Sequence, residues 1–200
     1  AGFSLGGNVL LKWLAEHRLD AIQAAAAISV PFDLARGARH IDKGFARVYQ
    51  ANFIASLKRK VYAKLERFPD LVDRRKLDAV RSIIEFDDLL TAPLHGFADA
   101  DDYYARSSAL GVLAEITVPT LLLSAVDDPF LPSAVLDDVR AVAKTNPALT
   151  VEFVERGGHV GFVSGTVPWR PIYYAEQRVS TFLASLLPNQ RGERPRPLRV

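Results

Sequence analysis

Three short hydrophobic runs predict strands in this chain. They lie at about 22–30, 120–126 and 150–154, and proline or polar residues follow each one. The run at 120–126 is apolar without alternation, which is typical of a parallel strand that helices cover on both faces. Strands of this kind, separated by segments of helical pattern, predict an α/β fold.

Two helical patterns stand out between these runs. After Ser4, hydrophobic residues recur every three or four positions as far as Leu14, as on one face of a helix. The segment of about 34–115 is too long for a loop without secondary structure. Its hydrophobic stripe comprises Phe45, Tyr49, Phe53, Leu57, Val61, Leu65 and Phe68. We expect an inserted helical lid that shapes an acyl pocket; the alternative is one or two amphipathic helices packed on the core.

The glycine-rich start of the chain carries the first candidate for chemistry. Residues 2–6 have the pattern G-x-S-x-G, in which a strand turns sharply into a helix and exposes the serine at the top of a parallel sheet. We expect Gly2 and Gly6 to be required because strand and helix pass closely there, and the Leu5 amide to hold an oxyanion. No strand is evident in front of Ser4. The alternative is a glycine-rich turn before a helix.

An activated serine needs a base and an acid, which follow it in this fold in the order Ser, Asp or Glu, His. Asp127 and Asp128 follow the run at 120–126, and His159 follows the run at 150–154. Open α/β sheets bind ligands at this edge. Each part has a structural alternative, a helix cap for the aspartates and a glycine turn around His159. The serine, an aspartate and the histidine nevertheless follow one another in the required order, which predicts a Ser-Asp-His triad.

Seven segments, taken together and in order, resemble the YheT-like group of α/β-hydrolases. The resemblance runs from residue 2 to about residue 187, through 2–8 (GFSLGGN), 30–33 (VPFD), 86–88 (FDD), 92–97 (APLHGF), 103–104 (YY), 127–130 (DDPF) and 157–162 (GGHVGF). It implies an esterase similar to carboxylesterases and acylglycerol lipases, without metal or organic cofactor. It also implies Ser4 as nucleophile, His159 as general base and Asp128 as acid, with short-chain esters or monoacylglycerols as substrates.

The choice of Asp128 over Asp127 rests on this resemblance. Adjacent residues at a strand end point to opposite sides, so only one of the two carboxylates can reach His159. The acid of the group precedes Pro-x-x-Pro, which here occupies 129–132. Asp127 stays open as the alternative acid, or as a cap of the neighbouring loop.

Composition excludes several kinds of site. The 200 residues contain no cysteine and no methionine, which excludes disulfides and thiolate metal sites. No stretch approaches the length of a transmembrane helix. Asp99, Asp101 and Asp102 lack the ligand order of an EF-hand, which argues against calcium. Because one base is sufficient, the other histidines are interpreted as structural. These are His17, His40 and His95.

The net charge of +2 is concentrated at the carboxyl end. Residues 188–200 contain four arginines and one glutamate, which leaves −1 for the rest of the chain. With Pro195 and Pro197 and no aromatic residue, this stretch predicts a disordered, solvated tail rather than a nucleic-acid arm. Contact with a membrane surface through the basic side chains of 58–67 is a weaker alternative.

We expect the chain to be the carboxyl-terminal half of a longer hydrolase. The N-terminal half of the sheet, and the loop that supplies the second oxyanion donor in this fold, are not recognisable, and the first residue is alanine. Residues 1–187 would then form a partial domain that is nearly inactive and poorly folded alone. We expect a cytoplasmic protein, although the lack of cysteine assigns no compartment, and the oligomeric state is left open.

The resulting hypothesis is a serine esterase that transfers an acyl group to water. Ser4 would attack an ester carbonyl, His159 would take the proton and Asp128 would fix the imidazole. Three alternatives stand beside it, since a fold does not determine a function. They are an acyltransferase on the same triad, a binding module with an incidental serine, and a truncated inactive remnant.

Overall fold

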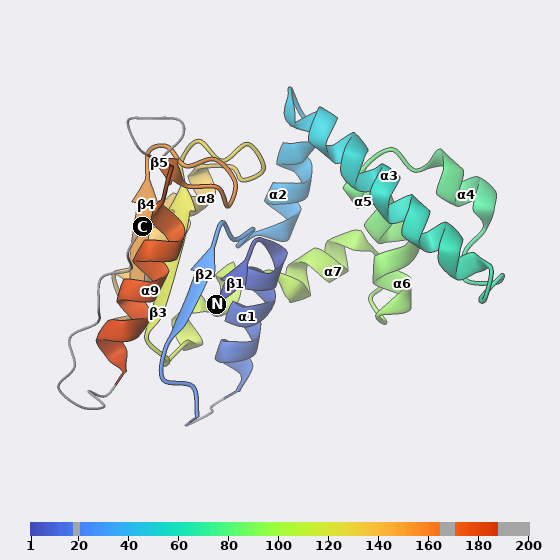
Figure 1. The fold of residues 1–200 in the computed structure, drawn as a ribbon. Coiled ribbons are helices and arrows are strands. Elements are labelled where there is room, and N and C mark those ends of the chain that lie inside the picture. Colours follow the sequence, from blue (N-terminus) through green and yellow to red (C-terminus); the bar gives the residue numbers. More distant parts are fainter. Residues whose placement is uncertain (18–20, 165–170, 188–200) are drawn as a thin grey trace.

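The computed structural model describes residues 1–17, 21–164 and 171–187, so the predicted tail at 188–200 lies outside the described residues. Four parallel strands form one sheet in the order β1-β2-β3-β4 (Figure 1). The sheet and the elements around it are β1 (Gly2–Phe3), α1 (Leu5–Glu16), β2 (Ala25–Ile28), β3 (Thr120–Ala125), α8 (Ala134–Ala143), β4 (Leu149–Val154), the antiparallel pair β5 (Val163–Ser164) and β6 (Ile172–Tyr173), and α9 (Tyr174–Leu186).

Between β2 and β3 the chain leaves the sheet and forms a group of helices, which lies to its right in Figure 1. We call residues 34–115 the helical insertion. Its elements are α2 (Leu34–Ile41), α3 (Ala46–Leu65), α4 (Arg74–Ala79), α5 (Ile83–Phe86), the π-helical turn η1 (Asp87–Thr91), α6 (Ala92–Leu94), α7 (Ala100–Ser107) and the 3-10 turn η2 (Leu110–Glu115). The segment is helical, as its pattern predicts; that it acts as a lid stays a prediction.

All three predicted strands are present, with bounds that differ by up to three residues. The prediction that no strand precedes the serine is wrong, because Gly2 and Phe3 pair in parallel with Ala27 and Ile28. The strand was missed because its two residues are too few to show the alternation of hydrophobic and polar positions that marks a strand. The pairing makes β1 the edge strand and brings Ser4 to the carboxyl end of the sheet.

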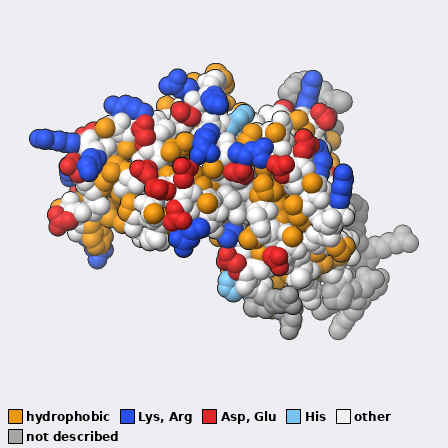
Figure 2. Space-filling model, turned by 180° about the vertical axis from the view of Figure 1, so that it is seen from behind, with side chains coloured by type: hydrophobic (Ala, Val, Ile, Leu, Met, Phe, Trp, Pro, Cys, Tyr) orange, Lys and Arg blue, Asp and Glu red, His pale blue; other side chains and the backbone are white. Residues whose placement is uncertain are grey.

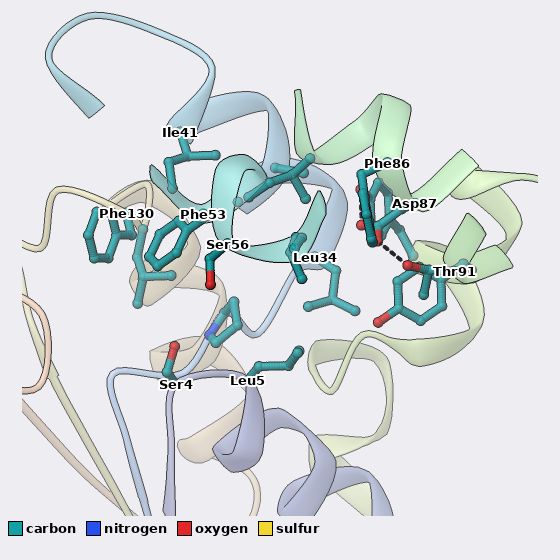
Figure 3. A pocket seen from close by; sticks show the side chains of 18 of the residues that line it. Ser4, Leu5, Leu34, Ile41, Phe53, Ser56, Phe86, Asp87, Thr91 and Phe130 are labelled. Atoms are coloured by element: carbon teal, nitrogen blue, oxygen red, sulfur yellow. Dashed lines mark hydrogen bonds between the residues drawn. The ribbon is translucent and has the colours of Figure 1, made fainter. Parts of the chain in front are cut away.

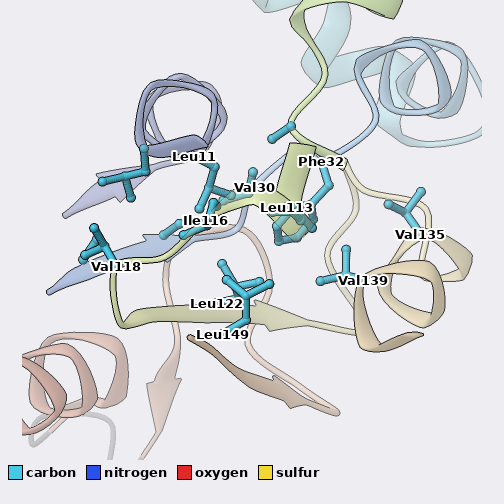
Figure 4. Packing of buried hydrophobic residues seen from close by; sticks show 14 of the residues in the cluster. Leu11, Val30, Phe32, Leu113, Ile116, Val118, Leu122, Val135, Val139 and Leu149 are labelled. Carbon is cyan, nitrogen blue, oxygen red and sulfur yellow. The ribbon is translucent and has the colours of Figure 1, made fainter. Parts of the chain in front are cut away.

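The two central strands, β2 and β3, are buried on both faces, which explains why they are apolar without interruption. Successive side chains of a strand point to opposite faces. Ala27 and Leu122 therefore pack with α1, η2 and α8, in the cluster that Figure 4 shows. Ile28 and Leu123 pack with α9 on the other face.

The helical insertion has a hydrophobic core of its own and uses only part of the predicted stripe. Val61 and Leu65 are buried there against α4, α5 and η1. Phe45 and Tyr49, at the other end of the stripe, are exposed by 75% and 40%. Phe68, the last residue of the stripe, is exposed by 53% as well. The stripe is therefore packed at Val61 and Leu65 and accessible at both of its ends. In the described ranges no helix is both long and apolar enough to cross a membrane.

A buried asparagine ties the end of the helical insertion to the helix behind Ser4. The side-chain amide of Asn8 donates to the Ser107 carbonyl at 2.8 Å, and its oxygen accepts from the Ala109 amide at 2.8 Å. Asn8 is 2% exposed, so the loss of either bond leaves a buried polar group without a partner. The returning chain is thus fixed against α1.

Candidate active site

The carboxyl ends of all four strands of the main sheet contribute a polar side chain to one place. Ser4 follows β1, Ser29 follows β2, Asp128 lies in the turn after β3, and His159 lies in the loop after β4. Parallel strands end at one edge of the sheet, where such folds bind ligands. Residues far apart in the sequence therefore meet there.

Ser4 sits at a strained turn between β1 and α1. Its φ of 50° and ψ of −127° lie in a region that residues with a side chain rarely adopt, at a cost on the order of 1–3 kcal/mol. Its amide donates to the Ile28 carbonyl at 2.8 Å, which holds the turn against β2. Leu5 is the first residue of α1, so its N–H has no acceptor within the helix and points out of the helix start. This amide suits an oxyanion donor.

The close approach of strand and helix requires glycine at Gly2 and Gly7, not at Gly6 as the motif suggests. A Cβ at Gly2 would lie 2.7 Å from the Gly6 carbonyl oxygen. A Cβ at Gly7 would lie 2.6 Å from a methyl group of Val30, whereas a Cβ at Gly6 would meet nothing within 4 Å. The sequence prediction for Gly6 is therefore wrong, because the helix turns Gly7 toward the sheet and Gly6 away from it.

We expect Gly7→Ala to destabilise the protein by about 1–3 kcal/mol, since the new methyl group overpacks a well-filled site. Gly6→Ala is the matched control and should be neutral or stabilising by up to about 1 kcal/mol, because alanine favours helix. Chemical denaturation of the full-length protein measures both changes. Equal stability of the two variants would refute this account of the turn.

Ser4, His159 and Asp128 form a continuous line of hydrogen bonds. Nε2 of His159 lies 2.9 Å from Oγ of Ser4, and Nδ1 lies 2.8 Å from Oδ2 of Asp128. The Asp128 side chain is fully buried and that of His159 is 17% exposed. A carboxylate accepts only, so Nδ1 carries the proton and Nε2 is left to accept from the serine hydroxyl. The other oxygen of Asp128 accepts from the Phe130 amide at 2.9 Å.

Asp127 has a different set of partners. Its Oδ1 accepts from the amides of Gly157 and Gly158, each at 2.9 Å. These amides belong to the loop that carries His159. Of the two candidate acids, Asp128 contacts the imidazole and Asp127 holds the loop in place.

Two residues near the triad were not found from the sequence. Ser29 is fully buried at a φ of 51°, and its Oγ accepts from the Val160 amide at 3.0 Å. The ring of Phe130 packs against that of His159, with centroids 4.6 Å apart. Both contacts join residues that are distant in the sequence or in separate loops, and no local pattern marks them.

A cavity of about 470 Å³ opens at Ser4 and His159 and extends under the helical insertion. In Figure 3, Ser4 and Leu5 lie on one side of it and Phe86, Asp87 and Thr91 on the other. Most of the lining is hydrophobic. The residues of the helical insertion that line it are Leu34, Gly37, Ala38, Ile41, Phe53, Ser56, Leu57, Lys60, Ile83, Phe86, Asp87, Thr91, Tyr103 and Tyr104.

The side of the cavity opposite Ser4 carries a partly buried carboxylate. Oδ1 of Asp87 accepts from the Thr91 hydroxyl at 2.6 Å, and Oδ2 accepts from the Tyr104 hydroxyl at 2.7 Å. Burial raises the pKa of Asp87, and these two hydrogen bonds oppose the rise. Burial is also the main reason why the pKa of Tyr103 and that of Tyr104 are raised.

The remaining candidates of the sequence lie outside the cavity lining. His17, His40 and His95 are not among the lining residues. Asp99 caps α7, and the side chains of Asp101 and Asp102 pair with arginines. In the part of the chain that the structure describes, no group of three or more histidine or carboxylate side chains is arranged to hold a metal ion.

Known proteins similar to this chain are hydrolases. The YheT protein of Escherichia coli (strain K12) is 40% identical over 93% of this chain and 54% of its own length. A monoacylglycerol lipase of Saccharomyces cerevisiae is 32% identical over 80% of this chain and 37% of its own length. No model of a protein family matches the chain.

The fold agrees with these sequence relatives. The solved structure of an alpha/beta fold family hydrolase from Bacillus anthracis str. Sterne aligns with 93% of this chain and 66% of its own, with a TM-score of 0.50 and 14% identity. The chain spans about half the length of the curated relatives it matches. With its parallel sheet, its serine turn and these relatives, the chain has an α/β-hydrolase fold and is similar to the YheT-like group of that fold.

Proposed function

We propose that this chain carries the catalytic triad of a serine esterase that cleaves carboxylic esters. The single observation that carries the proposal is the line of hydrogen bonds from Asp128 through His159 to Ser4, at the mouth of a mainly hydrophobic cavity. A nucleophile in contact with a base, and a base oriented by a third group, is the signature of nucleophilic catalysis. Two relatives, named as an esterase (YheT) and a monoacylglycerol lipase, support the same reaction class.

In the proposed reaction, Oγ of Ser4 attacks the ester carbonyl while Nε2 of His159 takes the hydroxyl proton. The tetrahedral intermediate collapses, its bond to the alcohol oxygen breaks, and His159 returns the proton to the departing alcohol. Water then attacks the acyl-enzyme with His159 again as base. The second collapse returns the proton to Ser4 and releases the carboxylic acid. Asp128 stabilises the imidazolium in both halves.

The Leu5 amide is the proposed oxyanion donor of this chain. It lies directly after the nucleophile and at the start of α1, where the helix dipole favours negative charge. The second donor of this fold comes from a loop after an earlier strand, and we propose that it lies outside this chain. Loss of one such donor costs about 10²–10³ in rate.

The helical insertion is proposed to act as a lid that shapes an acyl pocket. It contributes most of the cavity lining, and inserted helices are where such folds adjust substrate choice. Short-chain esters and monoacylglycerols remain the proposed substrates. Basic and acidic side chains are interspersed on the coloured part of the face in Figure 2, which gives little support to a nucleic-acid partner.

The proposal is tested on the full-length protein with p-nitrophenyl butyrate and a fluorophosphonate probe. We expect release of free butyrate and covalent labelling that is blocked when Ser4 is replaced by alanine. Formation of a new ester with an added alcohol, in place of free acid, would favour the acyltransferase alternative. Absence of both labelling and hydrolysis would leave a binding module or an inactive remnant.

A further inference from the structure

The side of the cavity opposite Ser4 is chemically unlike the rest of its lining. Leu34 lies between these two sides in Figure 3, and Ile83 and Phe86 add further hydrophobic side chains to the lining. An acyl chain attached to Ser4 would lie among such side chains. Asp87 lies on the side opposite Ser4, so the end of an acyl chain long enough to cross the cavity would meet a carboxylate there.

The hydrogen-bonding capacity of Asp87 is only partly used. Each of its two oxygens accepts one hydrogen bond, from Thr91 and Tyr104. A carboxylate offers about four acceptor positions. Within the described ranges Asp87 forms no salt bridge, so no cationic side chain pairs with it directly. Burying it against an alkyl end would cost free energy that a hydrogen-bond donor would offset.

Asp87 is also held in an unusual piece of backbone. It begins the π-helical turn η1, which ends at Thr91, and π-helical turns are frequent at functional sites. The turn places the Thr91 hydroxyl against the Asp87 carboxylate, and Tyr104 from α7 fixes the opposite oxygen. The carboxylate is therefore held from two elements of the helical insertion and kept in the cavity wall.

We infer that Asp87 is a specificity-determining residue that binds a hydroxyl group on the substrate's acyl chain, remote from the ester. The inference rests on the proposed function for the position of the ester at Ser4. A hydroxyl is favoured over an ammonium group for two reasons. A charged group loses far more hydration among apolar side chains than a hydroxyl does. Lys60 also lines the cavity and would repel a cation.

The test measures binding directly, so that it does not depend on turnover. The full-length protein with Ser4→Ala is titrated calorimetrically with methyl esters of straight-chain alkanoic acids and with their ω-hydroxy counterparts, from short to medium length. At the length that reaches Asp87, we expect the hydroxy ester to bind about tenfold or more tightly, as for a hydrogen bond to a charged group. Adding Asp87→Leu should abolish the difference.

Two further variants separate recognition from structure. Asp87→Asn keeps an acceptor oxygen and should retain a reduced preference for the hydroxy ester. This variant therefore tests the inference even if Asp87→Leu does not fold. Asp88→Asn is the matched control: Asp88 accepts from the Ala100 amide, its amide analogue keeps that oxygen, and the preference should be unchanged. Thermal unfolding midpoints verify that each variant is folded.

The inference is overturned if no length shows a preference for the hydroxyl, if the preference survives Asp87→Leu, or if ω-ammonium esters bind more tightly. Absence of binding by both series overturns it as well. The proposed function fails separately, when the unmodified full-length protein releases no acid from p-nitrophenyl butyrate. If such an inactive protein still bound the hydroxy esters selectively, Asp87 would be a ligand contact in a binding site without esterase activity.

Discussion

Replacement of Ser4 by alanine is expected to lower kcat for ester hydrolysis by about 10⁶. The substitution removes the only atom that can form the acyl-enzyme, and loss of the serine in other serine hydrolases has an effect of this size. His159 and Asp128 would remain hydrogen bonded to each other but would have no hydroxyl to activate. The rate of p-nitrophenyl butyrate hydrolysis by the full-length protein measures the loss.

The control for this prediction is a serine remote from the cavity. Ser185 lies on α9, and its hydroxyl donates to the Phe182 carbonyl. Ser185→Ala should keep both the hydrolysis rate and the fluorophosphonate labelling. A Ser4→Ala protein that retains most of its activity would show that another residue is the nucleophile.

Replacement of Asp128 by asparagine is expected to lower kcat by about 10⁴. An amide in the place of Oδ2 can donate a proton to Nδ1 of His159. This favours the tautomer in which Nε2 carries the proton and cannot accept from Ser4. The loss should appear in kcat with little change in the unfolding midpoint, because asparagine has nearly the same shape.

Asp127→Asn is the matched control for the neighbouring carboxylate. Its Oδ1 accepts both loop amides, and an asparagine keeps one acceptor oxygen for them. We expect a loss of about tenfold or less, since a weakened loop contact shifts His159 without changing its tautomer. If Asp127→Asn were the more damaging of the two, the roles of the adjacent aspartates would have to be exchanged.

Several expectations from the sequence stay predictions. They concern a cytoplasmic location, contact with a membrane surface through the basic residues of 58–67, and the poor folding and low activity of the isolated 200 residues. The structure adds one observation to the second of these, since Phe45 and Tyr49 are exposed aromatic side chains at the start of α3.

The sequence by itself determined the class of the fold and the order of the candidate chemistry. Apolar runs without alternation mark strands buried on both faces, and a strand end followed by Asp128 or by His159 marks the functional edge of a parallel sheet. Each of these signals depends only on neighbouring residues, so a single sequence is sufficient to show it. The stripe of the long helix was found for the same reason, although only part of it is packed.

The tertiary structure decided what depends on contacts between distant segments. It distinguishes Asp128 from Asp127 by their partners, and it moves the close glycine contact from Gly6 to Gly7. It also joins Asp87 of the helical insertion to the cavity that opens at Ser4. Local patterns carry only the propensities of neighbouring residues, whereas these features arise from packing and hydrogen bonding across the fold. For that reason the residue types that meet at this edge of the sheet could be anticipated from the chain, but the shape and polarity of the cavity could not.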